Sequence, residues 1–283
     1  MAVVMALLVV ALATSAVAYM LAQHELWIRQ SENLLAHAQA EAAARGGIEW
    51  ARYAQASAGA PRFAAPGADV TVSDAQSRFN VNNVMRDGQV SDADAAALRR
   101  LFTLLSIKPA LAAAVLDAID ADSETRSPGG AEDREYRALD PPRRAPNRPF
   151  SDVESLARLP GVDARTVAAL RPFLVALPKA TPVNVNTAPA AVLAALVPGL
   201  TLDAARALVE SRNETAFEDL GDFYAALPLE AAPSGAIMLA VDSRYAFVVS
   251  RARAGRAQVA YRALIESRNP LPARVLWRAR IEP

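Results

Sequence analysis

Residues 1–22 read MAVVMALLVVALATSAVAYMLA and contain no charged residue, no glycine and no proline. About 20 apolar residues in a helix are enough to cross the hydrocarbon core of a bilayer. We therefore predict that this stretch is a transmembrane helix. The alternative is a cleaved secretory signal with its cleavage site at Ala16-Val17-Ala18, but the apolar run is longer than the apolar region of a typical signal.

The helix is expected to continue well beyond the membrane. No proline occurs before position 61, and the first glycines are Gly46 and Gly47. The segment 23–57 is rich in Ala, Glu, Gln, Leu and Arg, which favour helices. One continuous helix to about residue 57 would be roughly 85 Å long. A thin apolar stripe runs along it at helical spacing: Ile28, Leu35, Ala38 and Ala42.

Composition excludes several classes of function. Lys and Arg total 30 and Asp and Glu total 30, so the formal net charge is zero, which argues against nucleic acid as the main partner. The chain has no cysteine, and its two histidines, His24 and His37, lie beside the apolar segment. Disulfides, thiolate metal sites, thiol nucleophiles and His-based catalysis in the globular part are excluded. We expect no catalytic residues and no enzyme.

Period-2 patterns predict strands at both ends of the remaining chain. Residues 69–72 and 78–84 have the composition of short strands, and residues 243–282 alternate apolar and polar positions as a β-meander does. The strands at 69–84 are too few to stand alone, so we expect them to join the strands of 243–282 in one sheet. The predicted fold class is α+β, with a long N-terminal transmembrane helix and an antiparallel sheet interrupted by a large all-α insertion.

Helical sequence fills the interval between these strands, from about residue 91 to residue 228. Pro and Gly residues separate the expected helices, which are 95–105, 109–119, 151–158, 163–176, 188–196, 201–212 and 216–226. The sheet domain would then comprise 59–90 and 229–283.

Two segments of the insertion resemble each other. Each has the predicted order helix, Pro-Gly turn, helix, and together they comprise residues 156–170 and 193–208. This order resembles that of helix-hairpin-helix or SAM-like modules. Such hairpins often bind DNA phosphates through a Gly-hydrophobic-Gly turn. Here Asp163 and Thr201 replace the second glycine, and the Asp163 carboxylate would repel phosphate. The pattern favours a packing or interaction role, and a membrane-anchored DNA-binding or DNA-uptake protein is the alternative.

An acidic loop, residues 117–135, concentrates seven carboxylates. Gly129-Gly130 permits a sharp reversal that would return its far end toward its beginning. Hard cations such as Ca²⁺ take six to eight oxygen ligands. We predict a calcium site, although the spacing is not that of an EF-hand, and the alternative is a solvated acidic loop. The candidate ligands are Asp117, Asp120, Asp122, Glu124, Glu132 and Asp133. Paired carboxylates also serve glycoside hydrolysis, but nothing else in the sequence predicts a sugar cleft.

Several stretches taken in order carry a family resemblance. They are Val4–Thr14, Arg29–Leu35, Phe79–Asn83, Asp117–Asp122, Gly130–Asp133, Asn147–Phe150 and Val183–Thr187. With these stretches the chain resembles the K-class minor pseudopilin (GspK) family, protein K of the type II secretion system. The family's precursors carry a basic leader that the prepilin peptidase removes after a glycine. We expect Met1 to lie within a codon or two of the mature end.

The resemblance implies a fold, a location and an assembly. Residues 1–22 would span the bacterial inner membrane once, residues 23–58 would continue the helix in the periplasm, and the sheet domain and the 91–228 insertion would make up the periplasmic bulk. The protein would cap the tip of the pseudopilus with I-class and J-class minor pseudopilins, and calcium would bind the acidic loop. H-class subunits, the major pseudopilin fibre and the inner-membrane assembly platform would be further partners, in support of protein export across the outer membrane.

The transmembrane segment itself fits the tip position. Major pilin-type subunits carry a glutamate five residues into the mature helix, which is thought to meet the N-terminal amine of a neighbouring subunit. Met5 stands near that position, and residues 1–22 contain no acid. A tip subunit has no subunit above it to neutralise, and a lone charge in an apolar bundle is costly. The alternative interpretation is an ordinary membrane anchor, which also lacks acids.

Overall fold

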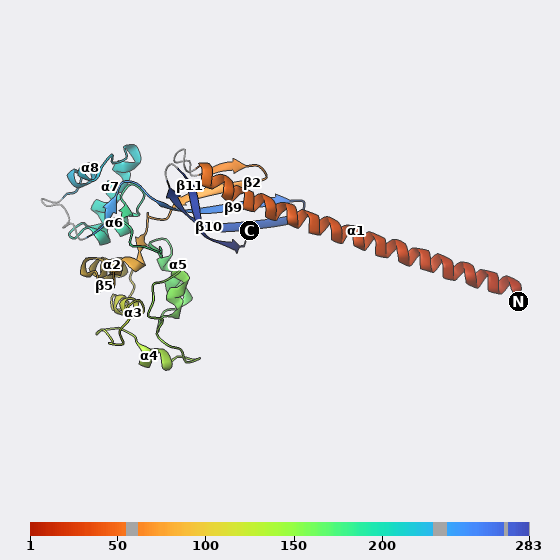
Figure 1. Ribbon diagram of the computed structural model, residues 1–283, viewed down its shortest axis with the longest axis horizontal. Coiled ribbons are helices and arrows are strands. Elements are labelled where there is room, and N and C mark those ends of the chain that lie inside the picture. The colour runs from red at the N-terminus through yellow and green to blue at the C-terminus, as the bar shows by residue number, and fades with distance from the viewer. Residues whose placement is uncertain (55–61, 229–236, 269–270, 283) are drawn as a thin grey trace. The chain divides into compact units, whose positions relative to one another are not determined.

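The computed structural model describes residues 1–54, 62–228, 237–268 and 271–282. The chain divides into two compact units (Figure 1). Unit 1 comprises residues 1–73 and 246–283, and unit 2 comprises residues 74–245. Each unit has its own buried apolar cluster.

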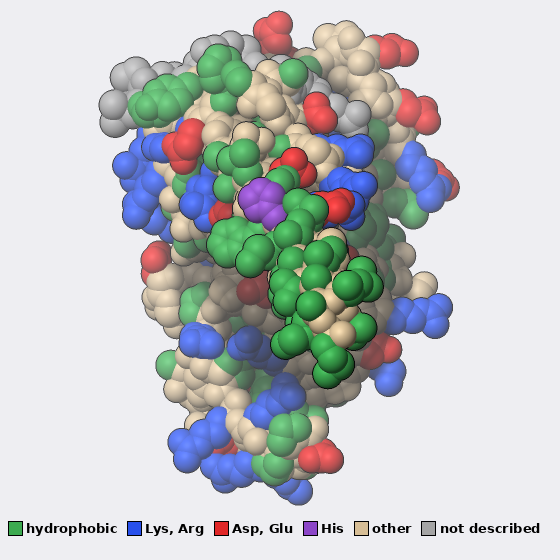
Figure 2. Space-filling model, turned by 90° about the vertical axis from the view of Figure 1, so that its right-hand side faces the viewer, with side chains coloured by type: hydrophobic (Ala, Val, Ile, Leu, Met, Phe, Trp, Pro, Cys, Tyr) green, Lys and Arg blue, Asp and Glu red, His purple; other side chains and the backbone are tan. Residues whose placement is uncertain are grey.

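A single long helix, α1 (Ala2–Ala54), opens unit 1. It is the one helix within the described residues that is long and apolar enough to cross a membrane, with a mean hydropathy of 2.4 over 18 residues and none of that window buried. Figure 2 looks toward its N-terminal end, where hydrophobic side chains cover the helix surface. The predicted continuous helix is confirmed as far as Ala54, and its last three predicted residues lie outside the described ranges.

Unit 1 also contains a five-stranded sheet with the order β1-β2-β9-β10-β11. Its strands are β1 (Arg62–Ala65), β2 (Ala68–Asp74), β9 (Tyr245–Ala254), β10 (Ala257–Arg268) and β11 (Leu271–Ile281). The pairs β1–β2 and β10–β11 are antiparallel. Because β2 and β9 are neighbours in the sheet, unit 2 is an insertion between two adjacent strands.

The C-terminal part of α1 packs on this sheet through small residues. Ala40, Ala44, Ile48 and Ala51 are fully buried with strand residues such as Val248, Val259, Ala263 and Ile265. Gly47 allows the closest approach, since a Cβ atom there would lie 2.2 Å from Ser250 Oγ of β9. The predicted apolar stripe is a different face of the helix: Ile28 and Leu35 are 47% and 60% exposed. The small side chains of α1 pack on the sheet, and the apolar stripe lies on the exposed side of the helix.

Unit 2 is mainly helical. Its helices are η2 (Val81–Val84), α2 (Asp92–Leu104), α3 (Leu111–Asp117), α4 (Asp133–Arg137), η3 (Val153–Arg158), α5 (Ala164–Leu170), α6 (Ala190–Leu196), α7 (Leu202–Glu214) and α8 (Leu220–Ala225). Short strand pairs accompany them: β3 (Phe79–Asn80) with β6 (Leu174–Val175), β4 (Met85–Arg86) with β5 (Gln89–Val90), and β7 (Val183–Asn184) with β8 (Leu239–Ala240).

Two sequence predictions fail in unit 2. The expected helix 163–176 ends at Leu170, because Pro172 cannot supply a helical N–H, and β6 follows. The expected strand 78–84 does not join the main sheet, because β3 pairs in parallel with β6. Of the two early strands, only the one predicted at 69–72 lies in the main sheet, as β2.

Buried asparagines explain why unit 2 begins before residue 91. The Asn80 side chain accepts a hydrogen bond from the Leu177 N–H at 3.0 Å and donates one to the Lys179 carbonyl at 2.8 Å. Asn82 accepts from the Phe150 N–H and donates to the Phe150 carbonyl, both at 2.9 Å. These bonds tie the 79–84 segment to the helical unit. The division at residues 74 and 245 is therefore wider than the 91–228 boundaries expected from the sequence, and residues 229–236 lie outside the described ranges.

Adjacent glycines in α1 give a matched test of the packing on the sheet. Gly47→Ala should destabilise the protein by about 1–3 kcal/mol, because its methyl group meets Ser250 and Val70. Gly46→Ala should stabilise it by up to about 1 kcal/mol, since nothing lies within 4 Å and alanine favours the helix. Thermal unfolding in detergent measures both. Equal effects of the two substitutions would contradict the close contact between α1 and β9.

Candidate metal centre

The acidic loop folds around the carboxylate of Asp117. This residue is the last of α3 and is fully buried. Its Oδ2 accepts hydrogen bonds from the backbone N–H groups of Arg126 at 3.1 Å and Ala131 at 2.9 Å. Its Oδ1 accepts from the Arg126 guanidinium at 2.7 Å. Three donors therefore satisfy Asp117, which acts as the anchor of the loop.

Two glycines make the return of the loop possible. Gly129 has a backbone φ of +92°, which residues other than glycine rarely adopt. A Cβ atom at Gly130 would lie 2.3 Å from Asp117 Oδ2 and 2.3 Å from the Arg126 carbonyl oxygen. The Gly130 N–H donates to that carbonyl at 2.8 Å. The glycine pair thus lets the chain close tightly over Asp117 and brings the next residues back to the start of the loop.

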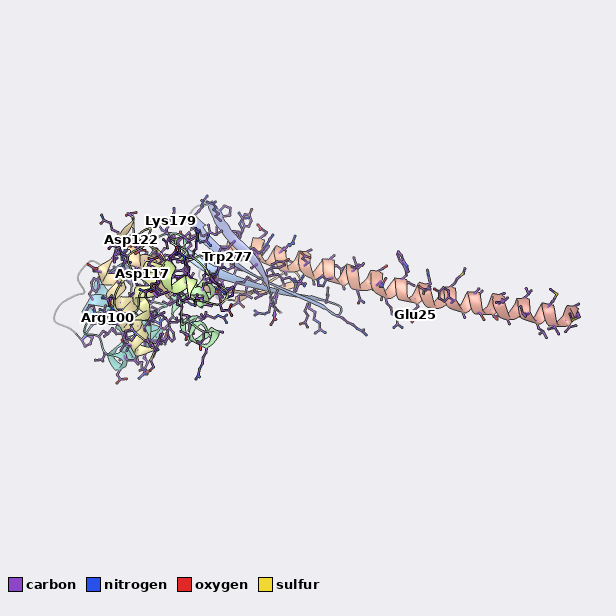
Figure 3. The ribbon with its side chains drawn as sticks, turned by 90° about the horizontal axis from the view of Figure 1, so that it is seen from below. Glu25, Arg100, Asp117, Asp122, Lys179 and Trp277 are labelled. Carbon is purple, nitrogen blue, oxygen red and sulfur yellow. The ribbon has the colours of Figure 1, made fainter. Side chains whose placement is uncertain are left out.

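This return gathers three carboxylates. One ligand oxygen each from Asp120, Asp122 and Glu132 lies within 4.8 Å of the others. Asp120 and Glu132 are only 6% and 3% exposed, whereas Asp122 is exposed. Figure 3 shows Asp117 and Asp122 in this part of unit 2. Asp120 Oδ1 and Glu132 Oε1 are buried without a hydrogen-bond partner in the described part of the chain. Unpaired buried carboxylate oxygens in such a group fit a hard cation that prefers oxygen ligands.

The other three predicted ligands are placed differently. Asp117 accepts three hydrogen bonds and lies outside the group of three. Glu124 is exposed and lies outside the group of three. Asp133 accepts the Ala145 N–H at 3.0 Å and forms an ion pair with Arg137 at 2.5 Å. The structure therefore brings together three of the six predicted residues.

Arg126 is a member of the site that the sequence analysis missed. One of its guanidinium nitrogens contacts both Asp117 and Asp120. Its position in the sequence, as a single arginine with carboxylates on both sides, pointed to such a role. The carboxylates that its side chain meets depend on how the loop closes, which the sequence does not show. Burial lowers the pKa of Arg126, and its hydrogen bonds to Asp117 and Asp120 outweigh that effect and raise it.

Burial and mutual repulsion govern the protonation of the cluster. Burial, with the charges of Asp120, Asp117, Asp122 and Asp133, raises the pKa of Glu132 to about 7. The Tyr136 hydroxyl is buried without a partner among the described residues, and burial next to Glu132 and Asp117 raises its pKa to about 12. A cation at this site would favour the charged form of Glu132.

The two predicted hairpins are present, and their own side chains occupy the hairpin helix starts. Pro160-Gly161 separates η3 from α5, and Pro198-Gly199 separates α6 from α7. Asp163 Oδ1 accepts the Thr166 N–H at 2.7 Å, and Thr201 Oγ1 accepts the Ala204 N–H at 3.2 Å. A carboxylate at the first helix start opposes phosphate there. The geometry gives no support to the DNA-binding alternative, and the SAM-like description stays a prediction.

Comparisons with known proteins agree with the sequence motifs. Two sequence profiles, both described as type II secretion system (T2SS), protein K, match residues 77–179 and 183–242. Type II secretion system protein K of Pseudomonas aeruginosa is 34% identical over 192 residues, which cover 66% of this chain and 56% of that protein. The Klebsiella pneumoniae protein is 34% identical, covering 69% and 64% of the two chains. That of Pectobacterium carotovorum is 31% identical, covering 72% and 68%.

A solved structure extends the match to three dimensions. One chain of the crystal structure of the GspK-GspI-GspJ complex from enterotoxigenic Escherichia coli superposes with a TM-score of 0.69 and 26% identity. The match covers 94% of this chain and 99% of that one. The apolar helix, the antiparallel sheet and the inserted helical unit define a minor pseudopilin of type II secretion. Within that class, the chain belongs to the type II secretion system protein K family.

The raised pKa of Glu132 predicts a pH dependence of stability in the absence of divalent cations. The carboxyl titrates at about 4.5 when unfolded and at about 7 when folded, so its protonated form is the one that folding favours. This contribution is complete below pH 4.5 and is lost as the pH rises through about 7. In chelator, the melting temperature should therefore fall between pH 5 and pH 8. Glu132→Gln should flatten this fall and the exposed Glu124→Gln should not; equal slopes for the two variants would contradict the assignment.

Proposed function

We propose that this protein caps the tip of the type II secretion pseudopilus and initiates its assembly with I-class and J-class minor pseudopilins. Unit 2, inserted between β2 and β9, is the observation that carries this proposal. A shaft subunit must stack repeatedly with its helix close to those of its neighbours. An insertion of residues 74–245 on every subunit would crowd such a shaft, whereas one copy at the end meets no such limit. The role is structural, and we propose no catalysis.

The cellular location and the further partners that we propose follow from the same role. The apolar start of α1 would hold the subunit in the bacterial inner membrane, with the rest of the chain in the periplasm. The prepilin peptidase would act on the precursor, and the assembly platform would move the subunit into the fibre. H-class subunits and the major pseudopilin would continue the pseudopilus below it. Assembly would support the export of folded proteins across the outer membrane.

The outward face of α1 is the surface that we propose for partner helices. It carries Leu35, Trp50 and Tyr53, which are 60%, 53% and 63% exposed. Ala42 and Gly46 lie between them at helical spacing and are also exposed. Small residues at four-residue spacing let a second helix approach closely, and the large residues around them add apolar area. The complex formed by the structural neighbour supports this choice of partners.

We propose Ca²⁺ as the structural ion of the acidic loop. Asp120, Asp122 and Glu132 would hold it, with carbonyl oxygens and water completing the shell. The ion would offset the repulsion between buried carboxylates and stabilise the loop at the edge of unit 2. This proposal rests on the two buried oxygens without partners, Asp120 Oδ1 and Glu132 Oε1.

A charge on the outward face of α1 tests partner binding. Ala42→Arg should reduce co-purification of the I-class and J-class subunits by about tenfold or more, because a guanidinium would be desolvated between apolar helices. Gln30→Arg is the control: Gln30 is exposed and lies five helical turns before Ile48, on the side that α1 presents to the sheet. The measure is the amount of each partner recovered with the full-length protein from membranes. Equal losses for both variants, or no loss for Ala42→Arg, would reject this surface.

Loop substitutions test the ion. Calcium at 100 times its dissociation constant should stabilise the wild-type protein by about 2.7 kcal/mol. Asp120→Ala and Asp122→Ala should lose most of this gain while changing stability in chelator much less. Glu124→Ala should keep the gain, since Glu124 lies outside the group of three. Thermal melts with calcium and with chelator decide it, and identical wild-type melts in the two conditions would refute the site.

A further inference from the structure

We propose that Arg126 is a built-in cation of the acidic loop, which lets the loop fold without metal and weakens its affinity for Ca²⁺. The inference rests on the proposed calcium site and concerns what this chain's own residue does toward the ion. It follows from the position of the Arg126 guanidinium between a buried anchoring carboxylate and a buried candidate ligand.

The acidic loop needs a positive charge to balance its buried carboxylates. Asp117, Asp120 and Glu132 are all buried, and Asp122 lies next to Asp120 and Glu132. Buried like charges destabilise a fold unless an opposite charge or a proton offsets them. Among the described residues, Arg126 is the basic side chain that forms ion pairs with this group. Its side chain is 29% exposed, so the guanidinium meets the carboxylates while its edge reaches solvent.

The Asp120 carboxylate would contact two cations, the Arg126 guanidinium and the metal ion. Its Oδ2 accepts from Arg126, and its Oδ1 is buried without a partner in the described part of the chain. An ion held by Asp120 Oδ1, Asp122 and Glu132 would share the Asp120 carboxylate with the guanidinium. Two positive charges on one carboxylate repel each other, and partial burial strengthens that repulsion. Arg126 therefore lowers the affinity of the remaining three-carboxylate group for a dication.

A pocket lies beside the Arg126 side chain. On the side of α3 its side chain lines a solvent-open pocket of about 420 Å³ together with Leu116, Pro128 and a second arginine, Arg99. The guanidinium can move into this space when an ion takes over Asp120, while the N–H of Arg126 still holds Asp117 Oδ2. The backbone thus keeps the loop closed in both states. Only the side chain has to exchange its contacts with Asp117 Oδ1 and Asp120 Oδ2 for solvent.

Two opposite effects of one substitution follow. Arg126→Gln removes the positive charge but keeps an amide donor and the backbone bond to Asp117. Without metal the loop should lose stability, because its carboxylates are left without a cation. With calcium the competition disappears, so the affinity for Ca²⁺ should rise by about tenfold or more. A residue that only supported the loop would weaken both properties together.

The experiment measures both properties on the full-length protein in detergent. Calcium titrations by calorimetry give affinity, and thermal melts in chelator give stability without the ion. Arg126→Gln should melt lower than wild type in chelator and bind calcium more tightly. Arg126→Lys, which keeps the charge, should stay near wild type in both. Arg134→Gln is the control, since Arg134 is an exposed arginine of α4 outside the cluster.

The outcomes separate this inference from the calcium proposal. If wild type binds calcium and Arg126→Gln binds it equally or less tightly, the role of Arg126 is overturned and the calcium site stands. If neither protein binds calcium, both are overturned. Binding by Arg126→Gln alone supports the inference, because the charge then excludes the ion. If Arg126→Gln is unfolded in chelator, refolding on addition of calcium supports it, and failure to refold overturns it.

Discussion

The carboxylate of Asp117 is buried without access to water, and the loop that follows is arranged to satisfy it. The backbone of Arg126 and Ala131 and the side chain of Arg126 all donate to it. A chain that supplies these donors must turn back on itself, and only glycine fits at position 130 where it does so. The same turn carries Glu132 to Asp120, so the geometry of the candidate metal centre is a consequence of satisfying one buried charge.

Buried and half-buried amides perform a similar task in the rest of unit 2, where regular strands are only two residues long. Asn82 pairs with both backbone groups of Phe150, and Asn186 pairs with both backbone groups of Phe217 at 2.9 Å. Each asparagine offers the donor and the acceptor that a neighbouring strand would offer. The asparagine-rich motifs at 79–83 and 183–187 therefore hold distant segments together. Their side chains stabilise the fold of the insertion by hydrogen bonds to backbone groups and, at Asn184, to the side chains of Asp74 and Ser243.

Much of this arrangement was predictable from the sequence, and the failures have physical causes. Apolar length and alternation predicted α1 and the strands β2, β9, β10 and β11 of the main sheet, since both depend on local patterns, whereas the short strand β1 was not predicted. The destination of β3 depended on side-chain hydrogen bonds to residues about a hundred positions away, which no local pattern contains. The apolar stripe of α1 does not mark the face that packs on the sheet, because close packing there uses Ala40, Ala44 and Gly47 instead of larger residues. The carboxylates of Asp117 and Asp133 accept hydrogen bonds from backbone N–H groups, whereas other carboxylates of the loop face each other. The composition of the loop could not distinguish these two sets.

The chain combines a helix long and apolar enough to cross a membrane, a sheet on which the C-terminal part of that helix packs, and one large insertion between neighbouring strands. In the proposed assembly the insertion lies at the end of the pseudopilus and nowhere else along it. Immunogold labelling of isolated pseudopili, with antibodies raised against unit 2, tests this claim most directly. We expect label at one end of each fibre. Label along the whole fibre, or filaments formed by this protein alone, would contradict it.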